Sequence, residues 1–115
     1  MRSLFLILFL PVASIAGETT IVDVEAAQDG EAWRFDVTVS HGDEGWEHYA
    51  DAWQVLGPDD AVLGTRELLH PHVTEQPFTR SLAGVAIPAE LGEVRVRARD
   101  SVHGWGPPVA VTLPR

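Results

Sequence analysis

Strict alternation of apolar and polar residues constrains this chain more than any other feature. Residues 93–100 read Glu-Val-Arg-Val-Arg-Ala-Arg-Asp, and residues 32–40 alternate in the same way. Because successive side chains of a β-strand point to opposite faces, each segment predicts a strand with one buried and one solvated face. Clusters of Gly, Pro and Asp interrupt the alternation every ten residues or so, which is typical of an antiparallel all-β domain.

The alternation and the turn signals together predict about seven strands. We expect them at residues 20–27, 32–40, 49–56, 61–69, 78–82, 93–100 and 109–113. Their inward positions predict a core that comprises Trp33, Phe35, Val37, Trp53, Val55, Val94, Val96 and Val111. The outward arginines of residues 93–100 predict a solvated stripe paired with acids on neighbouring strands. By the same parity Asp51 and Asp100 face inward, so each needs a polar partner.

The first sixteen residues have the pattern of a secretory signal peptide. Arg2 supplies the positive start, residues 4–10 are uniformly apolar, and Ser14 and Ala16 are the small residues that precede a cleavage site. The apolar run is too short to span a bilayer comfortably. We therefore expect cleavage after Ala16, a single domain over residues 17–115 without a membrane span, and a periplasmic or secreted location.

Composition narrows the classes of partner. The chain contains no cysteine, which argues against disulfides, thiolate metal ligands and a lipoprotein anchor. It carries 17 acidic residues against 8 basic ones, a formal net charge of −9, and every basic residue is arginine. Such a surface repels nucleic acid and anionic lipid but attracts cations. We therefore expect no nucleic-acid partner.

A resemblance to a known family starts from the last hairpin. Residues 94–106, followed by a Val-rich strand, resemble the F–G hairpin of fibronectin type III and related bacterial Ig-like domains, and Trp33 sits where that family often keeps a buried tryptophan. The resemblance implies an antiparallel Ig-like β-sandwich, although Leu91 occupies the region where the family has its corner tyrosine. Residues 41–48 and 69–72 also resemble segments of small uncharacterised exported bacterial proteins, a likeness that implies no particular activity.

All five histidines fall in three loops that a sandwich of this kind brings to one end. His41 and His48 flank the loop after residues 32–40, His70 and His72 lie in the crossing loop over residues 70–77, and His103 lies in the last hairpin. The direction of the strands places these three loops at the same pole of the sandwich. Since loops commonly carry function, this pole is the predicted functional site.

The local motif His70-Pro71-His72 indicates metal chemistry. Pro71 favours an extended His70, and residues i and i+2 of an extended chain share a side. Neutral imidazole suits Cu(II), Zn(II) and Ni(II). Loop and strand-end acids could complete a shell or orient a ring: Asp43, Glu44, Glu47, Asp51 and Asp100. The first interpretation is a small exported protein that binds Cu(II) or Zn(II) through His41, His48, His70, His72 and His103.

Less specific interpretations of the same histidines remain open. His41 and His48 could be surface residues, since a neutral histidine hydrogen-bonds readily. His103 could replace an asparagine in a turn that needs a positive φ. Asp100, Ser101 and His103 include the residue types of a catalytic triad, but no activated-nucleophile motif surrounds Ser101. We therefore do not expect an enzyme.

The tryptophans support an alternative function. Trp33 and Trp53 belong to the predicted core, whereas Trp46 and Trp105 could pack over the end of the sandwich, stack against a sugar or anchor a partner. The alternative to metal binding is a metal-free protein–protein interaction module, whose contact residues would be Trp46, Trp105, Glu47 and Asp43. Carbohydrate binding is a further possibility with the same aromatic residues.

Overall fold

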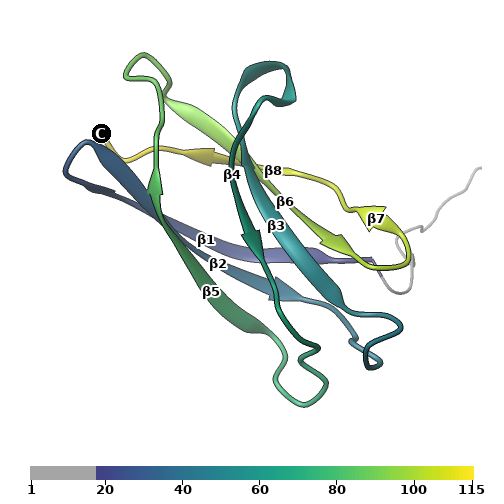
Figure 1. Ribbon diagram of the computed structural model, residues 1–115. Helices are drawn as coiled ribbons and strands as arrows, with labels where there is room; N and C mark the ends of the chain where they lie inside the picture. The colour runs from purple at the N-terminus through teal and green to yellow at the C-terminus, as the bar shows by residue number, and fades with distance from the viewer. Residues whose placement is uncertain (1–17) are drawn as a thin grey trace, which may run out of the picture.

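The computed structural model describes residues 18–115, which form two antiparallel β-sheets packed face to face (Figure 1). One sheet has the order β1-β2-β5 and comprises β1 (Thr20–Asp29), β2 (Ala32–Ser40) and β5 (Phe78–Val85). The other has the order β4-β3-β6-β7, with β8 also paired to β6, and comprises β3 (Ala50–Leu56), β4 (Val62–Glu67), β6 (Glu93–Asp100), β7 (Gly104–Trp105) and β8 (Val109–Thr112). A 3₁₀ turn, η2 (Pro58–Asp60), joins β3 to β4. The predicted all-β antiparallel sandwich is confirmed.

The strand boundaries follow the alternation closely. Strands β2 and β6 occupy the predicted residues, because their alternation is uninterrupted. Strand β5 continues to Val85, three residues beyond its predicted end. Strand β8 occupies most of the last predicted strand, and the short strand β7 lies in the segment predicted as the preceding hairpin. Pro107 and Pro108, which cannot donate to a β-ladder, separate the two. The predicted signal peptide at residues 1–16 lies outside the described residues, and none of the described residues forms a helix long and apolar enough to cross a membrane.

The core between the sheets is the predicted one. Inward side chains of β2, β3 and β6 that are almost completely buried include Trp33, Phe35, Val37, Trp53, Val55, Val94 and Val96. Val111 is only partly buried and packs against this cluster from β8. Each large core side chain contributes roughly 1.5–3 kcal/mol through burial. This core fixes the strand ends from which the loops of the pole emerge.

Asp51 does not face inward, in contrast to its predicted parity. The pairing of β3 with β6 shifts register between Ala50 and Ala52, which places an irregularity at Asp51. Its side chain lies on the outer face, where Arg99 donates to its two carboxylate oxygens at 2.9 and 3.1 Å. Asp100 is buried as predicted, with 1% of its surface exposed.

The outward arginines of β6 hold Trp105 on the outer face of the second sheet. The guanidinium carbons of Arg97 and Arg99 lie 4.4 and 5.4 Å from the centroid of the Trp105 ring. Arg95 is paired with Asp60, and Arg97 donates to Gln54 Oε1. The predicted pairing with an acid on a neighbouring strand is confirmed for Arg99, whereas Arg95 pairs with an acid in a turn and Arg97 with a neutral amide. Trp105 belongs to this stripe through cation–π contacts and does not pack over the end of the sandwich.

Candidate metal centre

Three possible metal ligands converge at the pole, two from the loop between β2 and β3 and one from the end of β6. His41 follows β2, His48 precedes β3, and Asp100 ends β6. One ligand atom of each lies within 4.8 Å of the other two. His41 Nε2 is 3.4 Å from Asp100 Oδ2, and His48 Nε2 is 3.6 Å from Asp100 Oδ1. Two ligands of a tetrahedral ion with bonds of about 2.0–2.1 Å lie roughly 3.3 Å apart, so these separations suit a shared ion. We refer to these three residues as the His41/His48/Asp100 site.

Strand pairing explains why His48 and Asp100 meet. Ala50 pairs with Asp100 in the β3–β6 ladder, and the Ser101 N–H donates to the Tyr49 carbonyl at 2.9 Å. The Tyr49 N–H in turn donates to Ser101 Oγ at 3.1 Å. The residue before Tyr49 therefore lies beside the end of β6, which is where His48 is found.

A carboxylate holds the far nitrogen of each histidine in the site. His41 Nδ1 lies 2.6 Å from Asp43 Oδ1, and His48 Nδ1 lies 2.8 Å from Glu44 Oε1. A histidine that donates Nδ1–H to a carboxylate leaves Nε2 as the acceptor. Carboxylates orient metal-binding histidines in this way and raise their basicity. Asp43 and Glu44 therefore orient both rings so that their Nε2 atoms face Asp100.

The side chains of the site are shielded from solvent, so each polar atom depends on a partner within the protein. The side chains of His41, Asp43 and Asp100 are fully shielded from solvent, and that of His48 is 15% exposed. Among the described residues, His48 Nε2 is a buried atom without a hydrogen-bond partner, since 3.6 Å to Asp100 is too long for one. A buried polar atom in this state costs roughly 1–3 kcal/mol. Its lone pair fits coordination of a cation.

The electrostatics of the site favour a carboxylate at its centre. Burial acts to raise the pKa of Asp100, but the backbone N–H groups of His103 and Val102 donate to Oδ1 at 2.5 and 2.7 Å and bring the pKa below its usual value. The hydrogen bond to Glu44 is the main reason that the pKa of His48 is raised. Asp100 is thus ionised at neutral pH and supplies a negative charge in a shielded position.

His103 lies at the rim of the site. Its Nδ1 is 3.1 Å from Asp100 Oδ2, its ring centroid is 5.0 Å from that of His48, and its side chain is 41% exposed. The positive φ of this turn, +84°, belongs to Gly104 and not to His103. An asparagine-like role for His103 is therefore not what the turn requires.

His70 and His72 do not join this site, in contrast to the expected role of their motif. Their rings share a side as the motif predicts, with centroids 4.7 Å apart. However, Arg80 Nη2 donates to His72 Nε2 at 2.8 Å, and the His72 ring stacks on Phe78 at 3.9 Å. Burial, followed by the charge of Arg80, lowers the pKa of His72. The cation at Nε2 and the stacking give His72 a structural position outside the His41/His48/Asp100 site.

Of the four residues expected to contact a partner, some are exposed to solvent and others are not. Asp43 is buried and therefore cannot belong to a partner surface. Trp46 is 67% exposed and contacts Tyr49 edge to face with centroids 5.6 Å apart, so it does not pack over the end of the sandwich. Glu47 is exposed beside it. Only Trp46 and Glu47 of the four are thus presented to solvent at the tip of the pole.

Sequence reasoning missed two residues that support the pole. Gln76 Oε1 accepts from the backbone N–H of His41 at 3.0 Å, and Gln76 Nε2 donates to the carbonyl of His72 at 2.9 Å. Arg80 holds the ring of His72. Both act across strands, and no spacing in the sequence links them to the histidines. The crossing loop that contains Gln76 was the one available signal.

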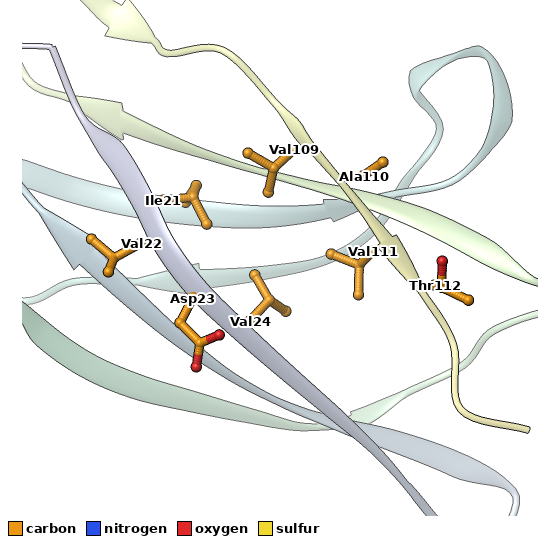
Figure 2. A pocket seen from close by; sticks show the side chains of 8 residues that line it. All are labelled: Ile21, Val22, Asp23, Val24, Val109, Ala110, Val111 and Thr112. Atoms are coloured by element: carbon orange, nitrogen blue, oxygen red, sulfur yellow. The ribbon is translucent and has the colours of Figure 1, made fainter.

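A groove elsewhere on the molecule is chemically different. It has a volume of about 430 Å³ and lies between the edge strands β1 and β8. Figure 2 shows the side chains of Ile21, Val24, Val109 and Val111 between these two strands, where they line the groove. Asp23 is the one ionisable residue among the eight that line it. This lining is unsuited to a metal ion, so the His41/His48/Asp100 site remains the candidate.

Comparisons with known proteins agree with the fold and leave the function open. No model of a protein family matches the chain. A protein of Halomicrobium mukohataei described as "Putative lipoprotein" is 44% identical over 90 residues, which cover 77% of this chain and 44% of that protein. The chain thus spans less than half the length of this relative. The crystal structure of a hypothetical protein from Pyrococcus horikoshii OT3 has a TM-score of 0.59 and 15% identity, covering 84% of this chain and 89% of that one, a likeness of fold alone.

Proposed function

We propose that this chain is a small exported protein that binds one divalent metal ion, Cu(II) or Zn(II), at the His41/His48/Asp100 site. One observation carries the proposal: two carboxylate-oriented Nε2 atoms lie 3.4 and 3.6 Å from the oxygens of a buried, ionised aspartate. Nitrogen and oxygen ligands of this kind suit Cu(II) and Zn(II), and the chain offers no thiolate. We propose binding, for storage, delivery or sequestration, in place of catalysis.

The signal-peptide pattern of residues 1–16 supports the exported part of the proposal. The description of the Halomicrobium relative as a lipoprotein points the same way, because lipoproteins are exported before they are anchored. The acidic composition, with a formal net charge of −9, favours the approach of cations. A periplasmic or secreted protein would meet its metal ion in that compartment.

A thermal melt with and without Zn(II), Cu(II) and Ni(II) tests metal binding. An ion that binds only the native state raises the melting temperature by mass action, and the gain corresponds to about 2.7 kcal/mol at 100 times the Kd. We expect His48→Gln to abolish the gain at neutral pH. His70→Ala is the matched control, since it removes an imidazole from the same pole but outside the site, and it should retain the gain. A wild-type melt that no ion shifts would end the proposal.

A second candidate function is docking of a protein partner at the same pole. Its supporting observation is that four exposed large hydrophobic residues lie on the three loops of the pole: Trp46, Leu69, Val73 and Val102. Tryptophan is a frequent anchor of protein interfaces. If the metal-free protein binds a specific partner in a pull-down, Trp46→Ala should abolish capture. Unchanged capture by Trp46→Ala would reject Trp46 as the anchor.

A further inference from the structure

His103 is placed to act on the same carboxylate oxygen as His41. Its Nδ1 lies 3.1 Å from Asp100 Oδ2, and His41 Nε2 lies 3.4 Å from that oxygen. Both separations are close to the roughly 3.3 Å between neighbouring ligands of a tetrahedral ion. An ion bound to Asp100 Oδ2 would therefore have both nitrogens within reach, with His48 on the side of Oδ1.

The two oxygens of Asp100 have separate tasks. Oδ1 accepts the backbone N–H groups of Val102 and His103, which fix the carboxylate and the start of the hairpin. Oδ2 accepts a hydrogen bond from the side chain of His103. The side-chain contact can therefore change while the backbone hydrogen bonds keep the loop in place. His103 is also the most exposed of the three imidazoles around Asp100, so it has room to reorient.

We infer that His103 is the fourth ligand of the proposed ion and exchanges its contact with Asp100 Oδ2 for a bond to the metal. This inference rests on the proposed function. In the exchange the proton on Nδ1 moves by way of solvent to Nε2, and the lone pairs of Nδ1 and Oδ2 that this frees both bind the ion. The resulting shell contains the nitrogens of His41, His48 and His103 and one oxygen of Asp100.

A four-ligand shell has a functional consequence. Metal sites with four protein ligands are closed, whereas catalytic zinc sites keep a position for water or substrate. With His103 as a ligand, the site would therefore bind the ion without leaving an open coordination position for catalysis. Removal of His103 would open a position to which an external ligand can bind.

The experiment compares wild type, His103→Ala and His103→Asn, all as Cu(II) and Zn(II) complexes. Asparagine can keep a side-chain hydrogen bond to Asp100 but cannot bind as an imidazole, so it separates a ligand from a positioning residue. In chelator competition we expect both variants to bind Zn(II) at least about tenfold more weakly. A tenfold loss of affinity is the smallest effect expected when a residue that only supports a metal ligand is removed. Free imidazole should restore affinity to His103→Ala. His70→Ala is the control and should bind as wild type does.

Spectroscopy gives the second readout. The electron paramagnetic resonance spectrum of the Cu(II) complex should show hyperfine coupling to three nitrogens in wild type and two in either His103 variant. Two nitrogens in wild type, or full affinity in His103→Asn, would overturn the inference while leaving the His41/His48/Asp100 site intact. A wild-type protein that binds neither ion would overturn the proposed function as well. Circular dichroism of the metal-free variants checks that they fold.

Discussion

Asp43 Oδ1 lies 2.6 Å from His41 Nδ1, and the side chains of both residues are completely shielded from solvent. The same oxygen accepts the backbone N–H of Ala50 at 3.1 Å, and Oδ2 accepts that of His72 at 2.6 Å. One carboxylate thus joins the loop after β2 to the loop before β5 and directs His41 toward Asp100. Asp43 therefore links the stability of the pole to the geometry of the candidate metal site.

Replacement of Asp43 should destabilise the protein strongly. Asp43→Asn retains one acceptor oxygen but places an amide NH₂ among three donors, so at least one buried hydrogen bond is lost. We expect the free energy of unfolding to fall by at least about 2 kcal/mol, because hydrogen bonds to charged groups are worth about 1.5–3 kcal/mol each. Urea unfolding measures this change. Asp29→Asn, at the exposed end of β1, is the control and should stay within about 0.5 kcal/mol of wild type.

The stability of the metal-free protein should depend on pH through His72. Its folded-state pKa is lowered, chiefly by burial, so the unfolded chain takes up the proton more readily below about pH 6.5. The free energy of unfolding should therefore fall as the pH drops through 6.5 toward the folded-state pKa. His48, with its raised pKa, acts in the opposite sense, adding stability below 6.5 that is lost as the pH rises through its folded-state pKa.

Variants separate these two histidines. We expect His72→Gln to lose less stability than wild type between pH 7.5 and pH 5.5, in a urea titration with chelator present. His48→Gln should instead lose more than wild type over the same interval, because it lacks the stabilising protonation. Parallel pH profiles for wild type and His72→Gln would show that His72 does not contribute to the acid sensitivity.

Gly106 is a position at which a single methyl group should matter. A Cβ there would lie 2.6 Å from Thr19 Oγ1, which donates to the carbonyl of Ala98 at 2.9 Å. Gly106→Ala must therefore displace Thr19 or the strand that holds it, at a cost of about 1–3 kcal/mol. At Gly92 a Cβ meets nothing within 4 Å, so Gly92→Ala is the matched control. Equal thermal melts of the two variants would contradict this packing.

The tryptophans at this end of the molecule should differ in their effect on stability. Trp105 is covered by the guanidinium groups of Arg97 and Arg99, and each cation–π contact is worth about 0.5–1 kcal/mol at an exposed site. Trp105→Ala should therefore lower the free energy of unfolding by about 1–2 kcal/mol. Trp46→Ala should change it by less than about 0.5 kcal/mol, since Trp46 is 67% exposed. Chemical denaturation that ranks them in the reverse order would refute this assignment.

Most features of the fold that depend on strand parity were predicted correctly from the sequence. The strands β2 and β6 and the burial of Asp100 follow from uninterrupted alternation. The orientation of Asp51 did not follow, because a register shift beside it in the β3–β6 pairing has no local signature. Strand direction also predicted that the histidine loops share one pole, where three of the histidines surround Asp100.

Side-chain orientation within the loops could not be predicted from spacing. His72 lies where its motif places it, but its ring is hydrogen-bonded to Arg80 and stacked on Phe78. Both of these residues belong to β5, on the other side of the loop. The roles of Asp43 and Glu44 as ring-orienting acids were among the sequence-based alternatives. Which of the five acids orients the ring of His41 depends on the tertiary contacts that bring Asp43 next to it.

Equilibrium dialysis of untagged protein against Zn(II) or Cu(II) at neutral pH tests metal binding most directly. We predict one bound ion per chain for wild type and for His70→Ala, and none for His48→Gln or Asp100→Asn. Binding should be lost in mild acid, because protons compete with the ion for the imidazole of His48, whose pKa is raised above its usual value. A wild-type chain that retains no ion at neutral pH, or a His48→Gln variant that retains a full equivalent, would contradict the proposed site.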